Sequence, residues 1–225
     1  MFRNLFIPKF AKISYSQCGE DLIISHIIKS LSIQTPTYID VGAHHPFYLS
    51  NTAYFYNGGC KGINIEPDPL LFTHILKKRP KDTNLNIGIG AFNGELDFYL
   101  MSTPTLNTFS YENAMTLQVE HGVRIKEIKK IPVETLANVI NKYNENRFPD
   151  FLSLDTEGYD LDILKTIDYL TNAPVVICVE TISYSTTGRG VKDDEIIQFL
   201  KERNYLVYAD TNINTILVKR SCWER

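Results

Sequence analysis

Short apolar runs alternate with amphipathic segments along most of this chain. Four of the runs, at 38–41, 62–65, 151–154 and 175–179, are followed by acids or turn residues and have the length of buried strands. The segments after them repeat apolar residues at the spacing of helices that pack on one face. We therefore expect an α/β fold in which a parallel sheet is covered by helices on both sides.

The helices are predicted near residues 20–31, 52–57, 69–79, 134–143, 161–167 and 194–200. The basic end of one of them, Lys77-Lys78-Arg79, suits a helix C-terminus and is interpreted as solvated charge. Further strands are expected at 84–90, 95–101 and 126–133, and the last two, at 205–209 and 215–219, are close enough to pair antiparallel.

No linker or repeat divides the chain. We expect an N-terminal arm and helix over 1–34 and a single domain over 35–225, with an insertion near 91–133. The polar stretch 102–122 is weakly patterned and long, which is typical of a functional loop or lid. The apolar residues of the arm suit docking on the body of the protein or on a second subunit of a homodimer.

Composition narrows the class of protein. With 225 residues, 44% of them hydrophobic, the chain can form one core of its own. A net charge of −3 argues against a broad basic surface for nucleic acid. No apolar run reaches the roughly 18 residues of a membrane span, and no secretory signal is evident. The four scattered cysteines indicate reduced thiols and a cytoplasmic protein.

Four predicted strands end in acids: Asp40, Glu66, Asp155 and Glu180. Ligands bind at the carboxyl ends of the strands in such sheets. Glu66 is placed to accept hydrogen bonds from both hydroxyls of a ribose, the alternative being a solvated strand end. The turn at Gly42, where the backbone would approach the ligand, lacks the further glycines of a dinucleotide site, and no P-loop is present.

A cofactor with adenosine but without bridging phosphates fits this pattern, and S-adenosylmethionine is the common one. Its carboxylate would lie at the helix start formed by Ser50, Asn51 and Thr52, because helix N-termini favour anions.

Several motifs in order then resemble the FkbM family of S-adenosylmethionine-dependent methyltransferases. They are Ser16-Gln17-x-Gly19-Glu20-Asp21, Ile39-Asp40-Val41-Gly42-Ala43, Ser50-Asn51-Thr52, Gly62-Ile63-Asn64-Ile65-Glu66-Pro67, Asn86-Ile87-Gly88 and Leu154-Asp155-Thr156-Glu157-Gly158-Tyr159-Asp160. The resemblance covers roughly residues 14 to 181. It departs from the family at His44-His45-Pro46, where many members have Asn and a further Gly.

The resemblance implies a class I methyltransferase fold, a Rossmann-like, doubly wound sheet that is mostly parallel with an antiparallel last strand. It also implies transfer of a methyl group to a hydroxyl, often on a sugar or a polyketide. The cofactor-binding residues that it implies are Gln17, Glu20, Asp40, Gly42, Ala43, Asn51, Thr52, Glu66, Pro67, Asn86 and Gly88.

The acceptor hydroxyl must lose its proton as the methyl group arrives, which needs a general base or a metal ion. Asp155 and Glu180 end neighbouring strands, in a pattern similar to the metal-dependent O-methyltransferases of the catechol type, and would suit Mg²⁺ or Mn²⁺. In the alternative, Asp155 or Glu157 contacts the cofactor or caps a helix, and His44 or His45 is the base. The candidate catalytic residues are therefore Asp155, Glu157 and His45.

The predicted lid offers Thr108, Tyr111 and His121 to the acceptor, and the loop 186–189 would close the other side, with Arg189 near a phosphate. The predicted function is O-methylation of a sugar, in particular a nucleotide-activated sugar for surface polysaccharide. Two alternatives stay open: a nicotinamide-dependent oxidoreductase of the Rossmann type, and a catalytically silent binding module on the same fold.

Overall fold

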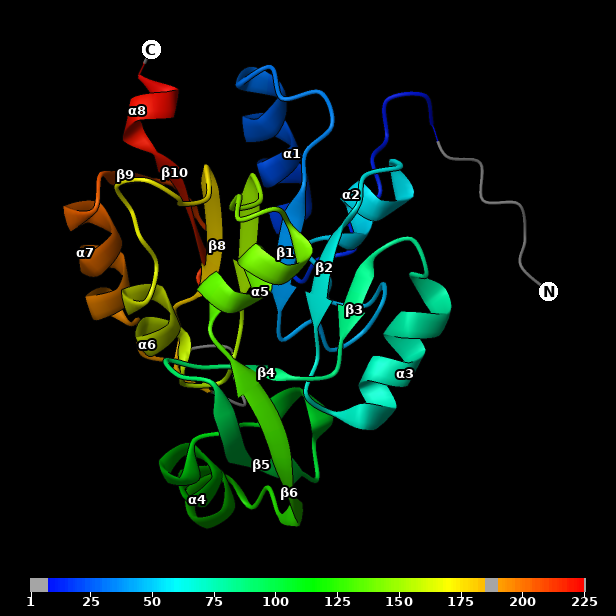
Figure 1. Cartoon of the computed structure of the whole chain (residues 1–225), viewed down its shortest axis with the longest axis vertical. Coiled ribbons are helices and arrows are strands. Elements are labelled where there is room, and N and C mark those ends of the chain that lie inside the picture. Colours follow the sequence, from blue (N-terminus) through cyan, green and yellow to red (C-terminus); the bar gives the residue numbers. More distant parts are fainter. Residues whose placement is uncertain (1–7, 185–189, 225) are drawn as a thin grey trace.

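A seven-stranded sheet forms the centre of the protein, as a computed structural model that describes residues 8–184 and 190–224 shows (Figure 1). The strand order is β3-β2-β1-β7-β8-β10-β9. The strands are β1 (Tyr38–Val41), β2 (Gly62–Ile65), β3 (Thr83–Leu85), β7 (Phe151–Leu154), β8 (Val176–Glu180), β9 (Tyr205–Asp210) and β10 (Asn214–Lys219). Strand β10 is antiparallel to both of its neighbours, which confirms the fold expected from the sequence.

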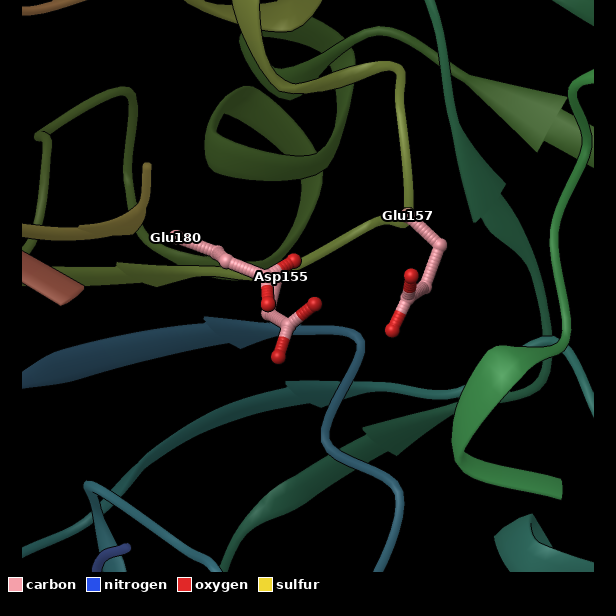
Figure 2. Close-up of side chains that lie close together, drawn as sticks. All are labelled: Asp155, Glu157 and Glu180. Carbon is pink, nitrogen blue, oxygen red and sulfur yellow. The ribbon is translucent and has the colours of Figure 1, made fainter. Parts of the chain in front are cut away.

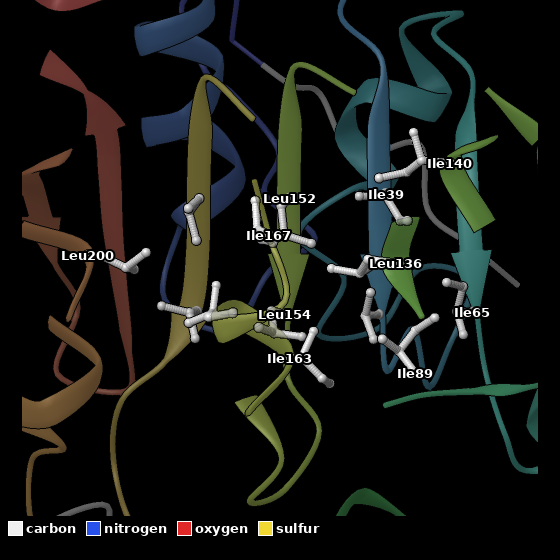
Figure 3. Close-up of a cluster of buried hydrophobic side chains, with 14 of the residues drawn as sticks. Ile39, Ile65, Ile89, Leu136, Ile140, Leu152, Leu154, Ile163, Ile167 and Leu200 are labelled. Atoms are coloured by element: carbon white, nitrogen blue, oxygen red, sulfur yellow. The ribbon is translucent and has the colours of Figure 1, made fainter. Parts of the chain in front are cut away.

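Helices cover both faces of this sheet. Helices α1 (Glu20–Ser30) and α2 (Ala53–Asn57) pack on one face, where Ile24, Ile27 and Phe55 contact apolar side chains of the strands. Helices α5 (Leu136–Tyr143), α6 (Asp160–Lys165) and α7 (Asp194–Glu202) pack on the other face, over the larger core in Figure 3. Helix α3 (Pro69–Lys78) follows β2, and α8 (Arg220–Trp223) follows β10.

A second, three-stranded sheet lies beyond the carboxyl ends of the strands of the first sheet (Figure 1). It contains β4 (Gly88–Ile89), β5 (Gly94–Met101) and β6 (Ile125–Glu134), in the order β4-β6-β5. The strand expected over 84–90 is therefore two short strands in different sheets, because Asn86 and Ile87 carry the chain from one to the other. The pattern of apolar residues along the sequence cannot show that the strand changes its hydrogen-bond partners in the middle of an apolar run.

The segment 102–122, expected as a loop or lid, contains a 3-10 turn, η1 (Pro104–Leu106), and an α-helix, α4 (Tyr111–His121). The Ser110 hydroxyl caps α4 by accepting a hydrogen bond from the Asn113 backbone N–H, and Gly122, at φ +68°, ends the helix. Few residues of α4 are buried, so its apolar pattern is weak in the sequence. We call residues 91–133 the insertion.

Arg79 corrects one expectation from the sequence. It is 1% exposed rather than solvated, and its guanidinium donates to the Asp82 carboxylate, the Tyr38 hydroxyl and the Thr52 hydroxyl. Thr52 in turn donates to Asp40 at 2.6 Å. Helix α3 ends one residue earlier, at Lys78, so the chain turns Arg79 under the sheet while the neighbouring lysines stay exposed. We call Tyr38, Asp40, Thr52, Arg79 and Asp82 the Arg79 cluster.

Two further features bear on the sequence predictions. None of the helices that the structure describes is long and apolar enough to cross a membrane. All four cysteines are free thiols, and Cys178 is fully buried in β8.

Candidate active site

A cavity of about 290 Å³ lies between the carboxyl ends of the main-sheet strands and the insertion. Its lining comes from the turns after β1, β2, β7 and β8 on one side and from the small sheet and η1 on the other. From the main-sheet side these residues include Gly42, His44, Asn51, Glu66, Asp155, Glu157 and Glu180, and from the insertion side Phe98, Leu106, Asn107 and Phe109.

Glu66, at the end of β2, is the acid at one end of this lining and is 4% exposed. Its two carboxylate oxygens accept backbone hydrogen bonds from His44 at 2.7 Å and from Asp68 at 2.8 Å. Burial raises the pKa of Glu66 to about 8, with further contributions from the nearby Asp68 and Asp40 carboxylates. The backbone thus fixes the position of this carboxyl group, which faces the cavity.

Gly42 makes the turn after β1 possible. Its φ is +80°, and a Cβ atom there would lie 1.8 Å from the carbonyl oxygen of Asp155. The glycine is therefore needed where the turn after β1 packs on the turn after β7. Gly42 also lines the cavity, and the expected close approach of its backbone to a ligand stays a prediction.

Three residues with side chains hold a left-handed backbone conformation in the cavity lining: His44 at φ +50°, Leu49 at φ +56° and Glu157 at φ +54°. Such conformations cost about 1–3 kcal/mol each and persist where the surroundings fix them. They are found at sites whose side chains must point in a set direction, which agrees with a functional cavity here.

Asp155, Glu157 and Glu180 form an acidic trio at the far end of the cavity (Figure 2). One potential ligand atom from each lies within 4.8 Å of the others. Asp155 and Glu180 come from the ends of adjacent strands β7 and β8, and Glu157 comes from the loop after β7. The structure thus brings together the pair that the sequence predicted as metal ligands and adds Glu157 to it.

The trio has raised pKa values. Removal from bulk solvent raises the pKa of Asp155, Glu157 and Glu180, and repulsion from the nearby Asp160 carboxylate raises it further in all three. Asp155 is exposed and Glu157 and Glu180 are half-buried, and all three line the cavity. No lysine or arginine is among the described residues that line the cavity. Carboxylates so placed suit a hard divalent cation with oxygen ligands.

The predicted cofactor residues divide into two groups. Those that line the cavity are Gln17, Gly42, Asn51, Glu66, Pro67 and Gly88. Those that lie outside its lining are Glu20, Asp40, Ala43, Thr52 and Asn86.

The second group supports the first. Asp40 and Thr52 belong to the Arg79 cluster. Asn86 donates to the carbonyl oxygens of Glu66 and Pro67 at 2.8 and 3.0 Å. Glu20 accepts from the Cys18 backbone N–H and from Asn214. Acids and amides in a motif can thus face either side of a strand, which the motif does not reveal.

Of the two histidines, His44 lines the cavity and His45 does not. The Nδ1 atom of His45 accepts backbone hydrogen bonds from Phe47 at 3.1 Å and Tyr48 at 2.8 Å, so it stabilises the turn. This placement is at odds with His45 as a general base. Burial lowers the pKa of His44, and the neighbouring His45 lowers it further.

The sequence did not single out the apolar part of the lining. The rings of Phe98 and Phe109 are tilted against each other with centroids 4.6 Å apart, and Ile89 and Leu71 line the same cavity. Their apolar character is that of core residues, so only the topology identifies them. None of the predicted acceptor contacts Thr108, Tyr111 and His121 lines the cavity. Tyr184, which the sequence did not single out, does line it, and its ring lies edge-on to that of His121. The predicted loop 186–189 lies outside the described residues.

The strand order, the antiparallel β10 and a cavity beyond the carboxyl ends of the parallel strands define a class I S-adenosylmethionine-dependent methyltransferase. The methyltransferase FkbM domain matches residues 40–207, most of the chain, and the protein therefore belongs to the FkbM methyltransferase family.

Among solved structures, the chain is similar to precorrin-6y C5,15-methyltransferase from Geobacter metallireducens, with 13% identity and a TM-score of 0.46 over 88% of this chain and 87% of that one. It is also similar to a TehB-like SAM-dependent methyltransferase from Corynebacterium glutamicum, with 11% identity and a TM-score of 0.46 over 93% of this chain and 90% of that one. None of the curated proteins compared with the chain matches it.

Proposed function

We propose that this methyltransferase transfers the methyl group of S-adenosylmethionine to a hydroxyl of a sugar, with a divalent cation held by the acidic trio. The observation that carries the proposal is the trio itself. Three carboxyl groups share one end of the cavity, and no described residue of the lining neutralises them.

The cavity lining fits the cofactor. Glu66 supplies carboxylate oxygens for ribose hydroxyls, and Ile89 and Phe109 supply apolar surface of the kind that an adenine ring contacts. Asn51 and Gln17 offer amide groups to the polar end of the ligand. When bound, S-adenosylmethionine supplies an electrophilic methyl group, and its positive sulfonium suits a cavity lined by acids.

The trio also fits the cation in number and in kind. Asp155, Glu157 and Glu180 each offer carboxylate oxygens, which Mg²⁺ and Mn²⁺ prefer. A cation bound there would act as a Lewis acid beside the acceptor. The side chains themselves would orient the acceptor hydroxyl, and a carboxylate oxygen of the trio that does not contact the cation would take up its proton.

The charge of the lining bears on the form of the sugar. A nucleotide-activated sugar carries a diphosphate, and the described lining has acids and no lysine or arginine. If the acceptor is nucleotide-activated, its diphosphate must therefore contact the cation or lie outside the described lining. A neutral glycoside meets no such electrostatic penalty.

The test is mass spectrometry of sugars incubated with the protein and S-adenosylmethionine, using each sugar both as a free glycoside and as its nucleotide diphosphate. A mass gain of one methyl group that disappears in EDTA and returns with Mn²⁺ or Mg²⁺ is expected. Full activity in chelator would remove the cation from the proposal. Methylation only at a nitrogen or carbon atom would contradict the proposal that a hydroxyl is the acceptor. Calorimetric binding of NAD but not of S-adenosylhomocysteine would favour the oxidoreductase instead.

A further inference from the structure

One backbone atom of the acidic trio is held by the insertion. The carbonyl oxygen of Glu157 accepts a hydrogen bond from the Thr108 hydroxyl and another from the Asn113 side-chain amide, each at 2.8 Å. Thr108 is fully buried and pairs with Tyr99 of β5 through an isolated bridge, and Asn113 lies in the first turn of α4. Two parts of the insertion that are separate in the sequence therefore meet at one point of the loop after β7.

At that point two successive residues of the loop have positive φ angles. Glu157 has φ +54° and the following Gly158 has φ +112°. A Cβ atom on Gly158 would lie 2.1 Å from the Asn113 amide nitrogen, so the glycine is what lets Asn113 approach. From the other side of the loop, Asp160 accepts backbone hydrogen bonds from Thr156 and Gly158 at 3.0 and 3.3 Å. A left-handed residue with a side chain persists only when its surroundings fix it in this way.

The three acids differ in how they are fixed. Asp155 and Glu180 lie at the ends of β7 and β8, whose ladder sets their separation. Glu157 has no such support, because it lies in the loop. The direction of its Cα–Cβ bond depends on its backbone conformation, and rotation of that residue to an ordinary φ would turn its carboxylate away from the other two.

We propose that Thr108 and Asn113 are positioning residues that hold the Glu157 carboxylate beside Asp155 and Glu180. The insertion thereby completes the cation site as well as covering the cavity. This inference rests on the divalent-cation site of the proposed function. Neither Thr108 nor Asn113 lines the cavity, so both act through Glu157 and not on a ligand.

The test is calorimetric binding of Mn²⁺ to the full chain. Asn113→Leu removes one donor from an exposed side chain, and Thr108→Val removes the other with little change of shape. Loss of a group that orients a metal ligand typically costs about 10–100-fold in affinity, and we expect that loss from each variant. Thr108→Ser keeps the hydroxyl and should restore binding. Thr103→Val, at an exposed threonine of the same insertion, is the matched control and should bind as the unchanged protein does.

Binding of S-adenosylhomocysteine to the same variants separates positioning from general damage, since positioning predicts that this affinity stays within about twofold. An equal loss of both affinities would contradict the proposal. Tight Mn²⁺ binding by the unchanged protein and equally tight binding by Asn113→Leu and Thr108→Val would overturn the inference while leaving the cation site in place. Absence of Mn²⁺ binding by the unchanged protein would overturn the cation site and the inference together.

Discussion

Two groups of acids lie close to β1, and they differ in the partners that the protein gives their carboxylates. In the Arg79 cluster, Asp82 accepts hydrogen bonds from Arg79, from the Tyr38 hydroxyl, from Asn64 and from the Gly62 backbone. In the acidic trio no described cation faces the carboxylates, and repulsion raises their pKa values. One group has a buried guanidinium among its carboxylates, and the other has no described lysine or arginine in the cavity lining, so a ligand can supply the cation there.

The difference shows how a structural acid can be told from a functional one. Both groups contain carboxylates near strand ends, and motif position alone assigned Asp40 and Asp155 to the same site. Partners separate them: Asp82 accepts hydrogen bonds at both carboxylate oxygens and is paired with a buried cation, whereas Asp155 faces the cavity with no described lysine or arginine in the lining and is available for chemistry.

The largest effect is expected from Arg79→Met. It leaves Asp82 buried without its cation, and removal of one partner of a buried ion pair costs about 3–5 kcal/mol. Urea unfolding measures this as a lower midpoint. Lys78→Met, at the exposed neighbouring position, is the control and should change the free energy of unfolding by less than about 0.5 kcal/mol. A similar small change for both variants would contradict the buried pair.

The next effect is a gain in stability on addition of Mn²⁺. Because a ligand that binds only the folded state stabilises it, Mn²⁺ at 100 times its dissociation constant should raise the free energy of unfolding by about 2.7 kcal/mol. Asp155→Asn should abolish most of this gain, and Lys78→Met should keep it. A Mn²⁺ effect of equal size in Asp155→Asn would place the ion elsewhere.

A third effect concerns pH and Glu66. Its pKa in the folded protein is about 8, above the value in the unfolded chain, so the folded state holds a proton that the unfolded state has lost. Stability without ligand therefore falls as pH rises from about 5 to 8, by at most about 1.4 kcal/mol per pH unit from this group. Glu66→Gln removes the slope due to this residue. Parallel curves for the two proteins, measured by urea unfolding at several pH values, would rule out the raised pKa.

The smallest effect is that of Asp155→Asn on stability. Since no described cation loses a partner, the free energy of unfolding should stay within about 0.5 kcal/mol of the original value or rise, while methyl transfer falls. Thermal unfolding checks the first point and turnover the second. A destabilisation as large as that of Arg79→Met would mean that the trio holds the fold together, and the comparison between the two groups would fail.

Much of the main sheet could be predicted from the sequence. The continuous apolar strands 62–65, 151–154 and 175–179 and the closing hairpin correspond to β2, β7, β8, β9 and β10, because burial on both faces leaves a clear pattern. Two strands of the insertion, expected at 95–101 and 126–133, correspond to β5 and β6. The rest of the insertion could not be predicted in this way. Its helix α4 buries little surface, and the change of sheet between β3 and β4 leaves no mark in the pattern.

For the site, the sequence identified acids but not the faces on which they lie. Glu66, Asp155 and Glu180 end strands and face the cavity, whereas Asp40 lies within β1 and faces the Arg79 cluster. Arg79 was misjudged for a related reason: a basic helix end is usually solvated, and only the tertiary structure shows that the last residue turns inward. Phe98 and Phe109 have the pattern of core residues and carry no signal of their own.

The ends of the insertion are joined to one another. Gly88 pairs with Val133, Ile89 pairs with Glu134, and the Gly90 backbone N–H donates to the Glu134 carbonyl at 3.0 Å. The chain therefore enters and leaves the insertion through two paired strands, β4 and the end of β6. Sequence between these two strands can be lengthened, shortened or replaced without pulling the main sheet apart. A change within the insertion would therefore alter one wall of the cavity while the main sheet keeps its strand order.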